Sequence, residues 1–330
     1  MRARWSFAFS ALSLLALPTL AQSQQRLNPV VDLLAQNKPV FGLYAPANRA
    51  GRGAAPDPAT VKTPAQLAQD ALANKSADFI FNGNMEGGDR FDAGLTAYTD
   101  FVKGMAEAGV LQKGSGPRLS HPLAVKTPDI ARDPAGAVSR IGRQLNVGTS
   151  VIVLVGVESP EEVKQGLAAM RFASKGGTRS EEVGNAPAFW GLSEKEYKER
   201  ADVWPLNPKG ELLNWTIVES KVGIERVREI AAVKGIAVLF PGAGTLRGVY
   251  STTDASGARV RDDAAWDAAI QKVLAACKEF KVACGYPANT PTEIEQRMKE
   301  GFSVFISGWN DNGFKAVEHG RKLAGRPATN

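Results

Sequence analysis

The stretch that most constrains the fold lies between Trp215 and Arg247, where two apolar runs flank an amphipathic segment. The first run ends in a single carboxylate, Glu219, and the second run, Ile236–Phe240, ends in Pro-Gly-Ala-Gly. Strands of a parallel sheet are buried on both faces and therefore appear as continuous apolar runs. The stretch predicts a strand–helix–strand unit. Functional side chains are expected just after its strands, at Glu219 and in the loop that follows the second run.

Apolar runs of this kind recur along the whole chain, and most of them are followed by a helical pattern. Two of these helices carry a start signal, Ser159-Pro-Glu-Glu162 and Thr290-Pro-Thr-Glu293, with a capping hydroxyl before a proline. The eight predicted strands begin near residues 40, 78, 123, 151, 214, 236, 283 and 302. Eight strand–helix units predict an α/β fold with a single domain, a (β/α)8 TIM barrel. A doubly wound open sheet is the alternative, but no Gly-x-Gly-x-x-Gly motif follows the first strand.

Two long segments interrupt this alternation. Residues 46–63 are rich in proline, alanine and glycine and show no periodicity, and residues 173–211 contain several turn signals. Loops of this length in a compact domain usually form lids or binding loops. We therefore expect both segments to be long loops of the barrel.

The first residues have the pattern of a secretory signal peptide. Arg2 and Arg4 precede an apolar stretch, Trp5–Leu17, and the small residues Thr19 and Ala21 stand at the −3 and −1 positions of a cleavage site. A membrane anchor is the alternative, but this stretch is shorter than the roughly 20 apolar residues that span a bilayer. The pattern predicts a signal peptide over residues 1–21, a barrel over residues 22–330 with no membrane span, and a secreted or periplasmic location.

The charges and the cysteines limit the classes of partner. The net charge is +6, but the charges are scattered and form no basic run, so a nucleic-acid partner is not expected. The two cysteines, Cys277 and Cys284, could form a disulfide in an exported protein or remain two buried thiols, and their spacing does not decide between these states. No histidine lies near them, which disfavours a zinc site.

Several segments together resemble the HpcH/HpaI aldolase/citrate lyase family, metal-dependent 2-oxo-acid aldolases built on a (β/α)8 barrel. The resemblance extends from about Arg26 to the C-terminus. Its most specific part is IVES at 217–220, followed by REIAAVKGIAVLFPGAGTL, and the segments RLNPVVDLLAQNKPVFGLY and GFSVFISGWNDNGF are similar as well. The resemblance implies a carbon–carbon lyase that acts on a small 2-oxo or related carboxylic acid. It also implies a homo-oligomer, because members of the family commonly form hexamers.

The resemblance further implies a metal site. Members of the family hold a divalent cation with a glutamate after the fifth strand and an aspartate after the sixth. Glu219 matches the glutamate, whereas the aspartate position is occupied by Thr245. The implied cofactor is Mg²⁺ or Mn²⁺, with Co²⁺ as a further candidate. The neutral hydroxyl of Thr245 leaves the site with one negative charge fewer than the family pattern.

The other family positions imply the catalytic and substrate-binding residues. The family's arginine after the third strand falls on Lys126, and its Asp-x-Glu-His-Gly segment falls on Asn84–Gly88, where Glu86 is kept and the histidine is replaced by Gly87. Lys126 is expected to stabilise an enolate, and Glu86 or a metal-bound water to act as the base. A Schiff base on Lys126 is a minor alternative. The remaining candidates for substrate binding are Arg179, Gly242, Gly244 and Thr245.

Neither histidine of the chain is expected to replace the missing one. His121 precedes Lys126 by five residues on one strand, roughly 16 Å away and towards the opposite barrel end. His319 lies on the last predicted helix. Since the family's histidine and aspartate are both replaced, a second hypothesis remains open. The chain could be a protein that binds small acids on an aldolase barrel without turnover.

Overall fold

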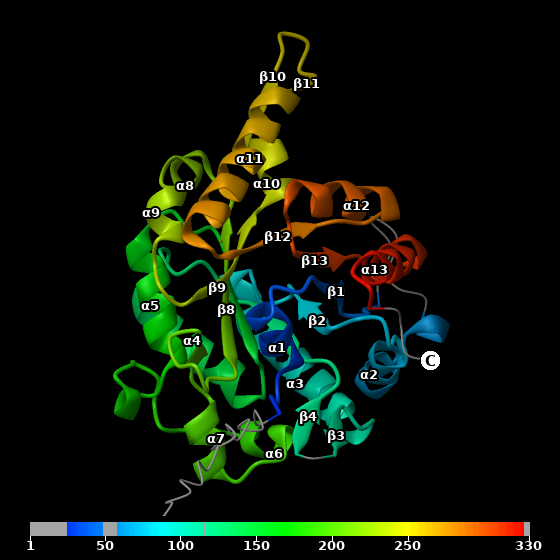
Figure 1. The fold of residues 1–330 in the computed structure, drawn as a ribbon, viewed down its shortest axis with the longest axis vertical. Coiled ribbons are helices and arrows are strands. Elements are labelled where there is room, and N and C mark those ends of the chain that lie inside the picture. Colours follow the sequence, from blue (N-terminus) through cyan, green and yellow to red (C-terminus); the bar gives the residue numbers. More distant parts are fainter. Residues whose placement is uncertain (1–24, 49–57, 115, 327–330) are drawn as a thin grey trace, which may run out of the picture.

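In the computed structural model, which describes residues 25–48, 58–114 and 116–326, parallel strands form a closed barrel surrounded by helices (Figure 1). Each barrel strand pairs in parallel with the next, and the pairing of the first with the last closes the ring. The eight strands are β1 (Val40–Tyr44), β2 (Phe79–Asn82), β5 (Leu123–Lys126), β6 (Val151–Leu154), β8 (Leu212–Val218), β9 (Ile236–Pro241), β12 (Ala283–Pro287) and β13 (Val304–Ser307). The predicted (β/α)8 barrel is confirmed.

The helices that follow the strands begin where the sequence signals place them. Ser159 accepts a hydrogen bond from the amide of Glu162, Thr290 accepts one from Glu293, and proline occupies the first helical turn in both cases. The helices around the barrel are α2 (Pro64–Ala73), α3 (Phe91–Glu107), α4 (Pro134–Asn146), α5 (Pro160–Met170), α8 (Lys221–Glu225), α9 (Val227–Ala231), α10 (Ala243–Val249), α11 (Asp263–Phe280), α12 (Pro291–Glu300) and α13 (Asp311–Leu323).

The barrel interior is filled by large apolar side chains. The Trp215 ring lies 4.8 Å from the Phe79 ring and 5.5 Å from the Phe240 ring, measured between centroids. Glycine is required beside these rings, because a Cβ atom at Gly42 or Gly285 would lie 2.2 Å or 2.1 Å from the nearest ring carbon. At the N-terminal end the apolar face of α1 (Pro29–Ala35) joins the same cluster. The barrel interior is therefore a packed core.

The excursion between α5 and β8 is more ordered than the sequence suggests. Residues 173–211 contain α6 (Ala186–Trp190), α7 (Glu194–Arg200) and the short strand β7 (Val203–Trp204), which pairs with β8. Helices of five and seven residues are too short to show a clear helical period. Figure 1 shows α6 and α7 at the end of the molecule away from the β10–β11 hairpin (Ser251–Thr253 and Arg259–Arg261). In the segment 46–63, the described part contains one 3-10 turn, Pro58–Thr60.

The two cysteines form a disulfide, which resolves the alternative that their spacing left open. The bond joins Cys277 near the end of α11 to Cys284 in β12. The predicted signal peptide, residues 1–21, lies outside the described residues. Within the described ranges, no helix has the length and apolarity needed to cross a membrane.

Candidate active site

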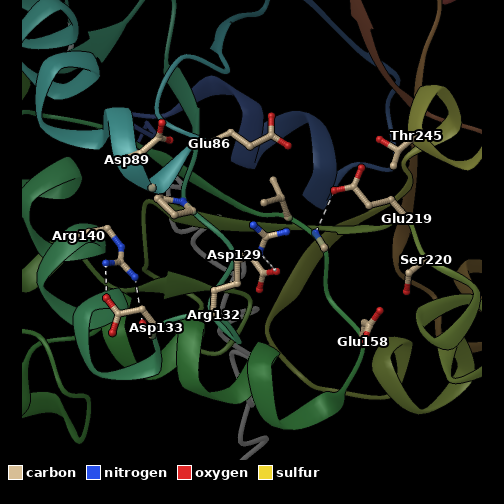
Figure 2. Close-up of a pocket in the computed structure, with 15 residues that line it drawn as sticks. Glu86, Asp89, Asp129, Arg132, Asp133, Arg140, Glu158, Glu219, Ser220 and Thr245 are labelled. Atoms are coloured by element: carbon tan, nitrogen blue, oxygen red, sulfur yellow. Dashed lines mark hydrogen bonds and ion pairs between the residues drawn. The ribbon is translucent and has the colours of Figure 1, made fainter. Parts of the chain in front are cut away.

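A cavity of about 690 Å³ lies at the C-terminal end of the barrel strands (Figure 2). Its wall is made by the segments that follow β2, β5, β6, β8 and β9, which is the usual location of active sites in this fold. The lining residues are Glu86, Gly87, Gly88, Asp89, Pro128, Asp129, Arg132, Asp133, Arg140, Val155, Gly156, Glu158, Glu219, Ser220 and Thr245. Three predicted site residues, Glu86, Glu219 and Thr245, therefore share one cavity.

Glu219 is fixed between two glycines from neighbouring strands. Its Oε1 atom accepts a hydrogen bond of 3.0 Å from the backbone amide of Gly156, after β6. On the other side its side chain passes over Gly242, where a Cβ atom would lie 2.4 Å from the Cβ atom of Glu219 and 2.7 Å from its Oε2 atom. Gly242, a predicted substrate-binding residue, is thus needed to make room for the carboxylate. The contact explains the first glycine of the Pro-Gly-Ala-Gly sequence.

Thr245 lies in the first turn of α10, and Figure 2 shows its side chain next to that of Glu219. Gly244 precedes it in the same turn but is not part of the cavity wall. A Cβ atom at Gly244 would meet no atom within 4 Å. The structure therefore gives a steric reason for Gly242 and none for Gly244.

Lys126 and Glu86 form an ion pair at the edge of the cavity. The Lys126 Nζ atom lies 2.7 Å from the Glu86 Oε2 atom, and the two side chains are 16% and 41% exposed. The end of β5 is fixed by Gln144, whose side-chain amide donates a hydrogen bond to the Lys126 carbonyl. Glu86 lines the cavity, whereas Lys126 is not one of the lining residues and contacts the cavity wall through Glu86.

The cavity contains charged residues that the sequence did not single out. Arg140 donates a hydrogen bond to Asp133, and this bond, followed by one from the Gly136 amide, lowers the pKa of the Asp133 carboxyl. The Arg132 side chain is 87% exposed and lies 3.4 Å from Asp129. Glu219 was predicted because functional residues of a barrel lie just after its strands. The same rule could have drawn attention to the segments after β5 and β6. In total, six carboxylates and two guanidinium groups line the cavity.

Arg179, the remaining predicted substrate-binding residue, lies elsewhere. Its side chain is completely buried. Its Nη2 atom donates hydrogen bonds to the side chains of Asn146 and Tyr197, and its guanidinium group stacks 4.3 Å from the centroid of the Phe172 ring. These contacts hold the excursion between α5 and β8 against α4. The structure does not bring Arg179 to the cavity.

Neither histidine lies in the cavity. His121 is buried before β5, with Nδ1 and Nε2 bonded to the Ser120 hydroxyl and to the Asn74 carbonyl. His319, on α13, is about one third exposed and pairs with Glu295. Carboxylates line the cavity, so the candidate proton acceptor at this site is a carboxylate or a water held by one.

The donors present fit a hard divalent cation, but with one carboxylate fewer than the family pattern. The described residues contain no group of three or more His, Cys, Asp or Glu side chains that could hold a metal. Glu219 has its Oε1 atom on the Gly156 amide, which leaves Oε2 for a cation, and the Thr245 hydroxyl lies beside it. Mg²⁺ is commonly bound through one or two carboxylates, with water and substrate oxygens as the other ligands. We therefore expect weaker metal binding than at a site with two carboxylates.

Comparison with known proteins identifies the class. The sequence profile of the HpcH/HpaI aldolase/citrate lyase family matches residues 130–312, more than half of the chain. The chain belongs to this family, whose members include carbon–carbon lyases. No curated protein gives a significant match.

Several solved structures are similar to this chain in fold. An HpcH/HpaI aldolase/citrate lyase family protein from Burkholderia cenocepacia J2315 is similar with a TM-score of 0.62 and 20% identity, over 85% of this chain and 92% of that chain. Macrophomate synthase has a TM-score of 0.56 and 18% identity, over 91% and 89% of the chains. The HpcH/HpaI aldolase from Desulfitobacterium hafniense DCB-2 has a TM-score of 0.56 and 16% identity, over 84% and 89%. At these identities the structures establish the fold alone.

Proposed function

We propose that the chain cleaves or forms a carbon–carbon bond next to the carbonyl group of a 2-oxo acid, in the cavity that contains Glu219. The observation that carries this proposal is the placement of Glu219. It follows the fifth barrel strand, is oriented by the Gly156 amide, and shares one cavity with Glu86 and Thr245. This arrangement keeps the family's first metal ligand in a defined position.

The chemistry requires a proton acceptor and a positive charge. In the cleavage direction the proton of a 4-hydroxyl group moves to a carboxylate and the bond between C3 and C4 breaks. The electron pair then remains as the enolate of the 2-oxo acid, which is protonated before release. Glu86 is the proposed acceptor, because it lines the cavity and is held by Lys126. The Lys126 ammonium group is the proposed fixed charge for the substrate carboxylate or the enolate.

A divalent cation would be held by the Glu219 carboxylate and the Thr245 hydroxyl. When bound, such a cation supplies Lewis-acid stabilisation of the negative charge that develops on the 2-oxo group. The role of the protein is to hold the carboxylate in place through the Gly156 amide and to keep the site open to substrate.

The test is a retro-aldol assay on a panel of 4-hydroxy-2-oxo acids with Mg²⁺, Mn²⁺ or Co²⁺. Glu219→Gln keeps the shape of the side chain but removes its charge, so we expect kcat/KM to fall by about a hundredfold or more. Direct Mn²⁺ titration should show weaker binding for the same variant. Glu225→Gln, on an exposed carboxylate of α8, is the matched control and should change neither quantity. Absence of metal-stimulated cleavage for every acid in the panel would contradict the proposal.

Binding without turnover is the second candidate, and the neutral side chain at the family's aspartate position favours it. A protein of this kind would be stabilised against heat by 2-oxo acids but would release no product. Turnover that a chelator abolishes would exclude this candidate. Thermal stabilisation by a 2-oxo acid, together with no cleavage over the panel, would favour it.

We further propose that the chain is exported and that residues 1–21 are removed. The Cys277–Cys284 disulfide supports export, because disulfides persist mainly in oxidising compartments. Mass spectrometry of the chain purified from the periplasm or medium should give an N-terminus at Gln22. A chain that keeps Met1 and stays in the cytosol would contradict the proposal. Light scattering would test the homo-oligomer that the family resemblance implies.

A further inference from the structure

Trp266, on α11, is a buried aromatic residue that contacts the candidate active site from behind. The residue is 8% exposed, and its indole Nε1 atom donates a hydrogen bond of 2.9 Å to the carbonyl oxygen of Ala243. Ala243 is the first residue of α10, the helix that carries Thr245. Trp266 is not one of the residues that line the cavity, and the proposed lyase chemistry gives it no role. The hydrogen bond therefore joins α11 to the site from outside the cavity.

The first turn of α10 depends on contacts from other segments. The helix has seven residues, and isolated helices shorter than about 12–15 residues are marginal in water. The residue before it is Gly242, which has no side chain to accept a hydrogen bond from the first turn. A larger residue would not fit there, because a Cβ atom at position 242 would lie 2.4 Å from the Cβ atom of Glu219. The close approach of Glu219 thus removes the usual way of capping this helix.

Two contacts from α11 hold α10 instead. One is the indole hydrogen bond to Ala243. The other involves Arg247, two residues after Thr245, whose guanidinium group lies 3.9 Å from the centroid of the Trp266 ring and pairs with Asp263 at 2.8 Å. The side chains of this ion pair are 39% and 68% exposed, and exposed ion pairs contribute little. The buried indole hydrogen bond is therefore the contact that fixes the first turn.

We propose that Trp266 is a positioning residue of the active site. Its hydrogen bond to Ala243 holds the first turn of α10 and keeps the Thr245 hydroxyl beside the Glu219 carboxylate, as Figure 2 shows the two side chains. The proposal rests on the proposed function, in which these two groups hold the cation. Groups that orient a metal ligand affect metal affinity strongly, although they do not touch the metal. A hydrogen bond fixes a direction as well as a distance, so its loss would let the turn shift even where the ring still packs.

Trp190 provides a matched control. Its Nε1 atom donates a hydrogen bond, also of 2.9 Å, to the carbonyl oxygen of Gly148, and the residue is completely buried. It belongs to α6 and does not line the cavity. Trp190→Phe and Trp266→Phe each keep an aromatic ring and remove one buried indole hydrogen bond, so both should lower Tm by similar amounts. An effect on the site that only Trp266→Phe produces cannot come from a general loss of stability.

The first measurement is amide hydrogen exchange of the ligand-free protein, followed by mass spectrometry in peptides that cover α10. Trp266→Phe should raise the exchange rate of the amides in this helix roughly fivefold or more, because the helix opens more often. Trp190→Phe should leave that rate unchanged. An α10 that exchanges at the native rate in Trp266→Phe, or equally fast in both variants, would overturn the proposal. This measurement needs neither a cation nor turnover, so it decides about Trp266 even if the proposed function fails.

The second measurement is Mn²⁺ binding by titration calorimetry. Trp266→Phe and Thr245→Ala should each weaken binding roughly fivefold to tenfold, whereas Trp190→Phe should bind Mn²⁺ as the native protein does. Because Trp266 acts through Thr245, Trp266→Phe should have no further effect when it is added to Thr245→Ala. A further loss of equal size in the double variant would overturn the proposal. Absence of Mn²⁺ binding by the native protein would instead contradict the proposed function, and hydrogen exchange would then decide the role of Trp266.

Discussion

Reduction of the Cys277–Cys284 disulfide should lower the free energy of unfolding by an amount that follows from its position. The bond closes a short loop, with a sequence separation of 7 between the end of α11 and β12. The chain-entropy relation for a loop of this size gives about 2.5 kcal/mol at 25 °C. With an m-value of about 3 kcal/mol/M in urea, the midpoint should fall by about 0.8 M.

The assay is reversible urea unfolding followed by circular dichroism, with and without dithiothreitol. The double variant Cys277→Ala, Cys284→Ala is the control, because reductant should not change its midpoint. Its own stability should fall slightly below that of the reduced protein, since both sulfur atoms are buried and their removal leaves small cavities. A midpoint for the native sequence that moves by less than about 0.2 M on reduction would refute the loop-entropy estimate.

Two further predictions concern the barrel core and a buried histidine. Gly42→Ala should lower the free energy of unfolding by about 1–3 kcal/mol, because the new methyl group would overlap the Phe79 ring. Gly244→Ala adds a methyl group that faces open space on α10, so it should be neutral or stabilise the protein by up to about 1 kcal/mol. Thermal unfolding of the two variants measures both effects. Burial lowers the pKa of His121 in the folded protein below its ordinary value of 6.5. As the pH falls, the imidazole is therefore protonated in the unfolded chain before it is protonated in the folded one. The stability that neutral His121 contributes is present above about pH 6.5 and is lost as the pH falls below it, by at most about 1.4 kcal/mol per pH unit. His121→Asn should flatten the stability profile between about pH 7 and pH 5, and an unchanged slope would contradict the assignment.

The sequence predicted the barrel because its strands and helix starts are encoded locally. Buried parallel strands are continuous apolar runs, and the capping signals at Ser159 and Thr290 are short motifs that do not depend on distant residues. Glu219, Glu86 and Thr245 could be predicted to share one cavity for a related reason. Each of them follows a strand, and the strand ends of a barrel converge whatever sequence lies between them.

Features that depend on packing between distant segments could not be predicted in this way. Arg179 lies in a segment without a strand end, and its position is decided by Phe172, Tyr197 and Asn146, which come from three separate segments of the chain. The Gly156 amide that orients Glu219 is a backbone group, and no residue type announces it. The sequence could not decide between a disulfide and two thiols for the same reason, because spacing alone does not fix the distance between α11 and β12.

This chain has Thr245 where the family has an aspartate, and this difference changes the charge of the cavity. Six carboxylates already line the cavity, and two of the nearby cations, Lys126 and Arg140, are engaged in ion pairs. An aspartate at position 245 would bring a seventh carboxylate and would repel an anionic 2-oxo acid more strongly. Thr245 removes that repulsion, but it also removes a ligand with the charge that a hard cation prefers.

The variant Thr245→Asp should therefore have two effects of opposite sign. Mn²⁺ should bind roughly tenfold more tightly, because the second carboxylate is restored, whereas pyruvate should bind more weakly when no divalent cation is present. Thr245→Asn, which changes the shape in the same way without adding a charge, should show neither effect. Titration calorimetry measures both affinities. If Thr245→Asp changed the two affinities in the same direction, charge at this position would not be what separates metal binding from acid binding in the cavity.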